Sequence, residues 1–254
     1  MARRGISPEL CLLLLGAVCL LALSCCKDSS EEGASGDTGR QGMKEHQPGE
    51  PNSADAGMVA IDIELPRQVY IGTKENIRVS PLEPLRKERR APFYAPPGTK
   101  NVAFGKPVTS TDKLPVYGEV EMITDGDKEA TDGSYVELSP FKQSVTIDLQ
   151  AEYDIYGILF WHYHTQPRVY FDVVVQVADD PDFIANVRTL FNNDNDNSSG
   201  LGTGKDMHYV ESYEGRLVRA DGVRARYVRL HSNGNHSNEL NHYIEVEVFG
   251  KPAK

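Results

Sequence analysis

Ser144-Val145-Thr146-Ile147-Asp148-Leu149 is the stretch that points most directly to the fold. Apolar and polar residues alternate strictly, so Val145, Ile147 and Leu149 share one face, which is the pattern of a half-buried β-strand. Such a strand needs partners, because its apolar face must be buried against another element.

Partners follow at short intervals. Four further stretches are apolar or alternating: 155–161, 171–177, 226–230 and 244–248. In the last of them Ile244, Val246 and Val248 share one face. Turn-forming clusters separate the stretches, among them Asp179-Asp180-Pro181 and Asn233-Gly234. No long amphipathic helical pattern appears, so the chain is predicted to be all-β, an antiparallel sandwich.

The first 24 residues are predicted to be a signal peptide. Arg3 and Arg4 precede an apolar run, 10–23, that is too short for a comfortable membrane span of about 20 residues. The run ends at Ser24-Cys25-Cys26, which resembles the cleavage site of bacterial lipoproteins, where the first cysteine after the cut carries lipid. We expect lipidation at Cys25 and an exported chain, bound to the membrane of the bacterial cell envelope by its N-terminal acyl group. Lipidation at Cys26 and an ordinary cleaved signal peptide are the alternatives.

Two segments lie between this leader and the strands. Residues 25–57 contain almost no apolar side chains and are predicted to be a flexible, lipid-anchored linker. Residues 58–100 contain six prolines and a basic run at 86–90, and they are predicted to be an extended lead-in that drapes over the domain at 101–251. Within the lead-in, 59–65 is a further strand candidate.

Cysteine placement and charge narrow the possibilities. All four cysteines lie in the leader, so the exported domain is predicted to fold without a disulfide. The formal net charge is −10, which argues against a nucleic-acid partner because phosphate binding needs basic surfaces. The same acidity keeps an exported domain soluble and is compatible with cations and with neutral ligands.

Five landmarks in order resemble the discoidin family, also called coagulation-factor type C domains. They are the stretches Asn101–Val108, Ile123–Asp127, Val145–Leu149, Ala225–Leu230 and Ile244–Gly250. The resemblance covers roughly residues 101–250 and implies a galactose-binding-like jelly roll. It also implies carbohydrate binding with a structural calcium, since many bacterial members are carbohydrate-binding modules of that kind. The chain departs from the family at Ala130, where a threonine is usual, and by its insertion at 191–204.

A calcium site is predicted from the second and last landmarks. Asp125 and Asp127 flank Gly126, which lets backbone carbonyls turn inward, and Ca²⁺ favours six to eight oxygen ligands. An ordinary Asp-Gly turn beside a solvated strand is the alternative. The resemblance maps the remaining ligand of the closing strand onto Glu245, with Glu247 as its substitute. The full predicted set is Thr124, Asp125, Asp127, Thr131 and Glu245.

Glycan recognition is predicted near the loops. Sugar hydroxyls need directional donors and acceptors, and the apolar sugar face needs an aromatic ring. The candidates with this chemistry are Trp161, Tyr163, His164, Arg168, Asn233 and Asn235. Trp161 has burial in the core as its alternative.

Other functions stay open with less support. The same loops, chiefly 192–207, would serve a structural or adhesion protein that binds a surface protein. His162 and His164 would give a metal-dependent hydrolase if a third histidine completed a zinc site. No catalytic serine, cysteine or phosphate-binding motif is present, so the chain is predicted not to be an enzyme.

The run 194–198 resembles an EF-hand start but lacks its glycine and glutamate, so a water-binding or flexible loop is expected, with a second cation as a minor alternative.

Overall fold

The structure is a computed structural model that describes residues 57–74 and 76–253. The predicted signal peptide, Cys25 and nearly all of the linker lie outside the described residues and keep the status of predictions. Within the described residues, no helix has the length and apolarity needed to cross a membrane.

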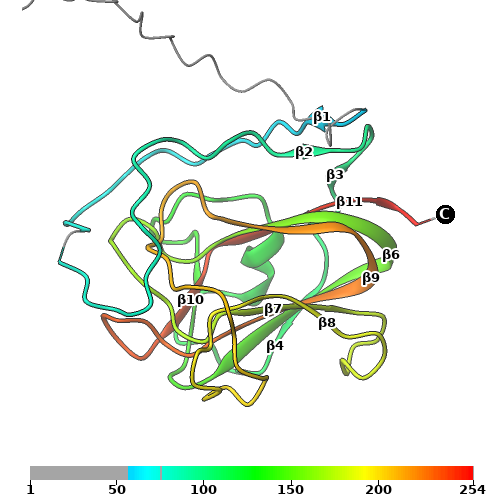
Figure 1. Ribbon diagram of the computed structural model, residues 1–254. Helices are drawn as coiled ribbons and strands as arrows, with labels where there is room; N and C mark the ends of the chain where they lie inside the picture. Colours follow the sequence, from blue (N-terminus) through cyan, green and yellow to red (C-terminus); the bar gives the residue numbers. More distant parts are fainter. Residues whose placement is uncertain (1–56, 75, 254) are drawn as a thin grey trace, which may run out of the picture. The chain divides into compact units, whose positions relative to one another are not determined.

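One large antiparallel sheet forms most of the domain (Figure 1). Its strands pair in the order β3 (Lys100–Asn101), β11 (Glu245–Pro252), β6 (Gln143–Trp161), β9 (Arg216–Ser232), β7 (Val174–Ala178) and β8 (Arg188–Asn192), and β4 (Val108–Ser110) also pairs with β6. Two small sheets join β5 (Val136–Leu138) to β10 (Asn241–Tyr243) and β1 (Val59–Ala60) to β2 (Tyr94–Ala95). Helical structure in the described residues is limited to the 3-10 turn η2 (Val120–Thr124). The prediction of an all-β, antiparallel fold is confirmed.

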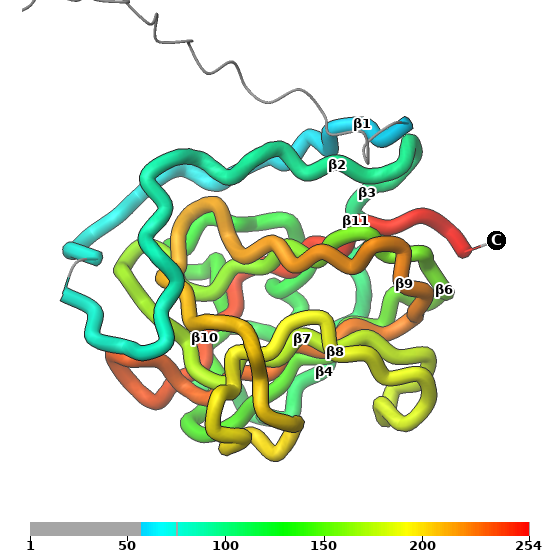
Figure 2. Tube along the Cα trace, in the orientation of Figure 1, coloured from blue at the N-terminus to red at the C-terminus, as the bar shows by residue number. Residues whose placement is uncertain are grey.

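The two longest strands build both layers of the sandwich. β6 pairs with β9 along nearly its whole length, but the register shifts between Asp148 and Tyr153. There Gln150 has φ +66°, and a second shift between Ile155 and Gly157 lies opposite Asp221, which has φ +48°. The paired strands therefore bend together, and the sheet folds over on itself around the core, as the tube in Figure 2 traces. The prediction of two separate strands at 144–149 and 155–161 is wrong in this detail: they are halves of one bent strand.

Alternation places the core as expected in most strands. Val145, Ile147 and Leu149 are fully buried and share the main apolar cluster with Val246 and Val248. Ile244 instead packs in a second cluster with Phe93 and Trp161. It lies between β10 and β11, where the strand is interrupted, so the predicted common face of 244–248 holds only from Val246 onward.

The lead-in lies against the domain in extended form. Only β1 and β2 form regular strands in it, and the predicted strand 59–65 shrinks to two residues. Ile61, Ile63 and Leu65 still pack on the second apolar cluster. Further along, His208 exchanges backbone hydrogen bonds with Pro81 and Glu83. Through these contacts the lead-in packs against one end of the sandwich.

Candidate functional site

The Asp-Gly turn and the last strand meet in space. The Gly126 N–H donates to Glu245 Oε2 at 3.1 Å, across 119 positions of sequence. Gly126 has φ +90°, and the side chains of Asp125 and Asp127 accept backbone N–H groups two residues further on. These bonds fold the turn tightly and hold both carboxylates at its surface. Sequence reasoning placed these residues together, and the structure gives them this contact.

Glu245 is buried with half of its carboxylate unpartnered. It is 0 % exposed, and Oε1 has no hydrogen-bond partner. Burial, with smaller contributions from Glu247 and Asp125, raises the pKa of Glu245 to about 9. A carboxyl group in this state either keeps its proton at neutral pH or needs a cation beside it.

Glu247 has a cation of its own. It points to the same side of β11 as Glu245, and its Oε1 lies 2.8 Å from Lys128 Nζ. The Lys128 ammonium also donates to the Glu64 carbonyl at 2.8 Å and lies 5.5 Å from the Trp161 ring centroid. Lys128 therefore neutralises the buried Glu247 carboxylate, whereas Glu245 is buried without a cation.

The calcium prediction fits this edge in part. The orphan oxygen of Glu245, the exposed Asp125 and the turn carbonyls have the oxygen chemistry that Ca²⁺ requires. Thr124 is buried and its hydroxyl donates to the Lys106 carbonyl, so its oxygen keeps acceptor capacity. Thr131 is exposed and bonds Ser134. Asp125, Asp127 and Glu245 do not form a converged group of three ligands in the described residues, so a calcium ion here would rely chiefly on Glu245 and the carbonyls of the turn.

Half-exposed tyrosines and an arginine form a second cluster, beside strands β5 and β10. Arg168 lies over the Tyr163 ring at 4.6 Å, Tyr163 packs edge-on to Tyr135 at 5.4 Å, and Tyr135 lies 5.1 Å from Tyr117. Tyr117 is 41 % exposed. The tyrosine–arginine cluster is completed by two ionisable residues that face each other in the β5–β10 register; its members are Tyr117, Tyr135, Glu137, Tyr163, Arg168 and His242.

One histidine tautomer connects the polar members of this cluster. His242 Nε2 lies 2.9 Å from Glu137 Oε2, and Arg168 Nη1 lies 3.3 Å from His242 Nδ1 and 3.2 Å from Nε2. Burial and the Arg168 charge lower the pKa of His242 to about 3, so the ring is neutral. It donates from Nε2 to Glu137 and accepts from Arg168 at Nδ1. Arg168 Nε has no partner, so the cluster retains a buried donor next to its aromatic surface.

The other predicted ligand residues are placed elsewhere. Trp161 is fully buried, and its Nε1 donates to the Tyr213 carbonyl, so it belongs to the core and offers no ring face to a ligand. His164 is 1 % exposed and bonds the Lys128 carbonyl. Asn233 donates to Asp172, and Asn235 holds its own loop through Asn238. Of the six candidates, the structure brings Tyr163 and Arg168 together and separates the rest.

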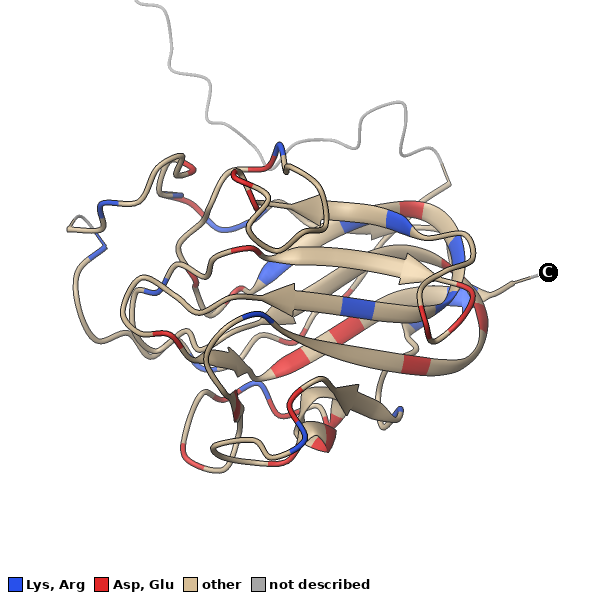
Figure 3. Cartoon of the chain, turned by 90° about the horizontal axis from the view of Figure 1, so that it is seen from below, with Lys and Arg blue, Asp and Glu red and all other residues tan. Residues whose placement is uncertain are grey.

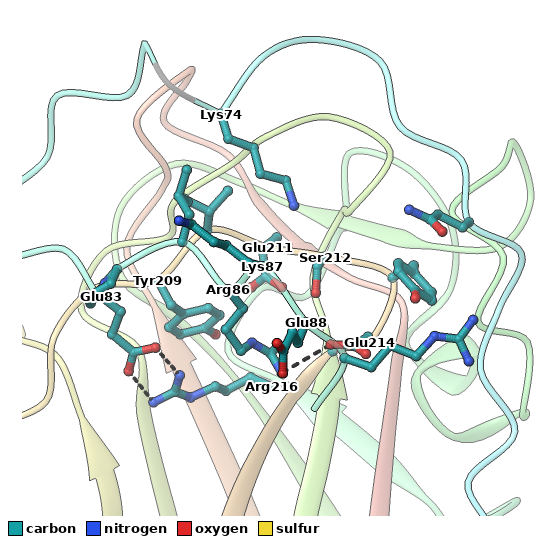
Figure 4. Close-up of a pocket in the computed structure, with 17 residues that line it drawn as sticks. Lys74, Glu83, Arg86, Lys87, Glu88, Tyr209, Glu211, Ser212, Glu214 and Arg216 are labelled. Carbon is teal, nitrogen blue, oxygen red and sulfur yellow. Dashed lines mark hydrogen bonds and ion pairs between the residues drawn. The ribbon is translucent and has the colours of Figure 1, made fainter. Parts of the chain in front are cut away.

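A cavity of about 230 Å³ separates the lead-in from the loop before β9 (Figure 4). Ion pairs cross it: Arg216 holds Glu83 by two bonds of 2.8 Å, and Arg86 reaches Glu214 at 3.1 Å. The Arg90 N–H also donates to Glu214. The basic run of the lead-in therefore lies against acidic residues of the domain, and these paired charges of the cavity wall neutralise one another.

The insertion holds an acidic group. Asp172, Asp194 and Asp196 bring carboxylate oxygens within 4.8 Å of one another, the one such group of three acidic or histidine ligands among the described residues. Asp194 accepts bonds from Ser198 and Ser199, and Asp172 accepts from Ser198 and Asn233. Donors of the insertion and the Asn233 side chain thus occupy the carboxylates of Asp194 and Asp172.

The two histidines behind the hydrolase alternative are buried and separately engaged. His162 is 0 % exposed and lies 2.7 Å from Glu211, while its ring stacks on Tyr170. Neither His162 nor His164 belongs to a group of three metal-ligating side chains in the described residues. This arrangement has the form of a buried polar network, with no open position for a substrate.

Four members of the tyrosine–arginine cluster were not among the residues predicted from the sequence. Tyr135 and Tyr117 lie between landmarks, and Glu137 and His242 become neighbours through the pairing of short strands far apart in sequence. One signal was available: Val136-Glu137-Leu138 alternates like a strand, so the residues around Glu137 were candidates for a sheet edge.

No protein-family model matches the chain, and no curated protein matches it. Among solved structures, similarity is found to a family 89 glycoside hydrolase from Clostridium perfringens in complex with 2-acetamido-1,2-dideoxynojirmycin, with 23 % identity and a TM-score of 0.44. The match covers 60 % of this chain and 15 % of the hydrolase, so the chain spans a small part of that enzyme.

Two smaller structures are matched over nearly their whole length. A carbohydrate-binding module of family 32 from the same hydrolase, in complex with GlcNAc-α-1,4-galactose, has 14 % identity and a TM-score of 0.45, covering 61 % of this chain and 96 % of the module. A chitosan-binding module from Paenibacillus sp. IK-5 has 18 % identity and a TM-score of 0.42, covering 59 % and 99 %. These identities and TM-scores are too low to assign a function, so the functional argument must rest on the residues of this chain.

Proposed function

We propose that this chain is a non-catalytic carbohydrate-binding protein that presents the tyrosine–arginine cluster to a glycan. The observation that carries the proposal is the row of half-exposed rings Tyr117, Tyr135 and Tyr163, flanked by the Arg168 guanidinium. Aromatic rings pack against the apolar face of a sugar, and the guanidinium, with Glu137 beside it, supplies directional bonds to hydroxyls. The burial of His162 and His164 favours binding over hydrolysis.

Glycan-array binding of the full chain tests the proposal. Arg168→Gln and Tyr163→Ala are each expected to weaken binding at least about tenfold, as for the loss of a central contact in a small site. Arg219→Gln is the matched control, because Arg219 is exposed and bonds only Asp221 and the Phe93 ring face. A folded chain that retains no glycan, or variants that bind like the parent, would contradict it.

A pull-down in excess free sugar separates glycan binding from protein adhesion. A surface protein held by the loop 192–207 would be captured with or without the sugar, and by the Arg168 variant as well as by the parent chain. Capture that disappears with free sugar and with Arg168→Gln supports the glycan.

Calcium is proposed as a structural ion at the Glu245 edge. When bound, it would supply the positive charge that the orphan oxygen of Glu245 requires, with Asp125 and the carbonyls of the turn as further ligands. Its effect would be to fix the entry turn to β11.

An acyl anchor at Cys25 is proposed to hold the protein on the cell envelope. Support comes from the sequence alone: a charged start, a short apolar run and a cysteine at its end. Incorporation of radiolabelled palmitate into the parent but not into Cys25→Ser is the expected result. Labelling that persists in Cys25→Ser and disappears in Cys26→Ser would place the lipid one residue later.

A further inference from the structure

A groove of about 530 Å³ lies on the large sheet and shares no residue with the tyrosine–arginine cluster. Ten side chains from β4, β6, β9 and adjoining loops line it. Four are basic or imidazole groups, Lys113, Lys142, Arg229 and His231, and the other six carry a hydroxyl or an amide. None of the ten is acidic, although the chain has a net charge of −10. We call this surface the basic groove.

Strand register assembles the basic groove on the outer face of the sheet. Thr146 of β6 pairs with Thr109 of β4 on one side and with Arg229 of β9 on the other, and Ser144 pairs with His231. Val145 and Ile147 point into the core, so their neighbours Ser144 and Thr146 point outward. Basic residues recur along the strands of the large sheet in Figure 3.

The charges of the groove are held by neutral groups. Arg229 donates to the Thr146 hydroxyl at 2.7 Å and to the Pro181 carbonyl at 2.8 Å. Lys113 donates to the Ser110 carbonyl, and Lys142 donates to the Ser199 carbonyl. No carboxylate forms an ion pair with these three cations in the described part of the chain; Asp182 and Asp180 act on Arg229 only from outside the groove lining. The Arg229 guanidinium also lies 3.9 Å from the Phe183 ring centroid, and Lys113 and Lys142 are exposed, so the three positive charges are accessible to an anionic ligand.

His231 adds a buried polar atom that lacks a partner. The residue is 8 % exposed, it lines the groove, and its Nε2 makes no hydrogen bond. Burial, together with Arg229 and Lys142, lowers the pKa of His231 to about 4, so the ring is neutral. A neutral imidazole can donate to or accept from a ligand hydroxyl.

An exposed aromatic residue adjoins the groove. Phe141 directly precedes Lys142, and Gln143 of the groove lining donates to the Pro140 carbonyl in the same loop. Phe141 is 80 % exposed and has φ +69°, a costly conformation for a bulky side chain. The buried Asn241 side chain holds the Ser139 and Phe141 carbonyls at 2.9 Å each, so the loop is fixed in this form.

From this geometry we propose that the basic groove binds an acidic saccharide, a glycan that carries carboxylates along with its hydroxyls. Arg229, Lys113 and Lys142 would receive the carboxylates, and the Ser, Thr and Gln side chains with His231 would pair with the hydroxyls. The groove is far larger than an inorganic anion requires, and Phe141 offers a ring for a sugar face. The inference extends the proposed function to a second surface and a charged ligand class, and it stands without the tyrosine–arginine cluster.

Calorimetric titration of the full chain with tetragalacturonate and with its methyl ester tests the inference, because esterification removes the negative charges and leaves the sugar backbone and its hydroxyls unchanged. We expect the free acid to bind at least about tenfold more tightly, with affinity falling as salt is added. Arg229→Gln and Lys113→Gln should each weaken binding of the acid by about threefold to tenfold. Arg224→Gln is the matched control: it removes an exposed arginine from the same strand, outside the groove, and should change binding less than about twofold.

Several outcomes would overturn the inference. These are equal affinity for acid and ester, binding unaffected by both groove variants, or inorganic sulfate binding as tightly as tetragalacturonate. Loss of binding in Arg168→Gln, with Arg229→Gln unchanged, would move the acidic ligand to the tyrosine–arginine cluster. Tetragalacturonate binding that depends on Arg229, in a chain that retains no neutral glycan, would support the groove and refute the cluster.

Discussion

The closing strand buries carboxyl groups, whereas the basic groove gathers two exposed lysines and a half-buried arginine around a buried imidazole. On β11, Lys128 pairs with Glu247 and not with Glu245, and each carboxyl group keeps an unpartnered oxygen. In the groove, three cations and a buried imidazole share no carboxylate. Both surfaces lie on the same sheet, and each is short of the charge that the other has in excess. A buried group without a counter-charge lowers stability, so such groups indicate what each surface is built to receive.

The largest effect is expected at the closing strand, from Lys128→Met. The change leaves the buried Glu247 carboxylate without its cation and should lower the free energy of unfolding by about 3 kcal/mol at pH 8. At pH 5.5 the loss should be smaller, because burial raises the pKa of Glu247 and the carboxylate takes up a proton. Urea unfolding at the two pH values measures this, with Lys106→Met as a control whose ammonium bonds Gln150. An equal loss at both pH values would show that Lys128 acts through packing alone.

Calcium is expected to act at the same strand. The pKa of Glu245 is raised to about 9, so the folded state retains a proton that the unfolded state loses above about pH 4.5. Stability without metal should therefore fall as pH rises from about 5 to 9. Millimolar calcium should raise the melting temperature by about 5 °C or more at pH 8, and by less at pH 5, because the ligand must be deprotonated.

Glu245→Gln makes the calcium test specific. It should flatten the loss of stability at alkaline pH and abolish the calcium response, as scanning calorimetry with and without chelator would measure. Glu152→Gln is the control, because Glu152 is an exposed glutamate on β6. A calcium response that survives Glu245→Gln would place the ion elsewhere, with the Asp172–Asp194–Asp196 group as the next position to change.

The groove should respond to pH in the opposite direction. Burial lowers the pKa of His231 to about 4, so between pH 6.5 and 4 the unfolded state binds a proton that the folded state excludes. Stability is therefore lost as pH falls through this window. His231→Gln should recover about 2 kcal/mol at pH 5 relative to its effect at pH 7.5, measured by urea unfolding. An unchanged acid limb in His231→Gln would contradict the assignment.

Alternation in the sequence predicted the strands but not the surfaces that they build. Val145, Ile147 and Leu149 identify their strand because burial selects for apolar residues at every second position. The groove depends instead on register: Thr109, Thr146 and Arg229 become neighbours only after two strands pair. Trp161 was misplaced as a ligand because aromatic chemistry was weighed above its own context, a run apolar on both faces. The family resemblance mapped Glu245 onto the closing strand, and the structure brings it to the Asp-Gly turn, whereas Glu137 and His242 meet through strands of three residues that no such landmark covers.

The smallest change in stability, and the sharpest distinction between the two surfaces, is expected at Phe141. Its side chain is 80 % exposed and its φ is +69°, a conformation that glycine adopts without strain. Phe141→Gly should therefore raise the free energy of unfolding slightly, by about 0.5–1 kcal/mol, while it weakens tetragalacturonate binding at the groove. Gln150→Gly is the matched control, because Gln150 is also exposed with φ +66° but lies at the strand bend and should change stability alone. Urea unfolding and calorimetric titration of both variants measure the two effects. A Phe141→Gly chain that loses stability and binds the acid unchanged would mean that this ring serves the fold, and the groove would then bind through its charges and hydroxyls without an aromatic face.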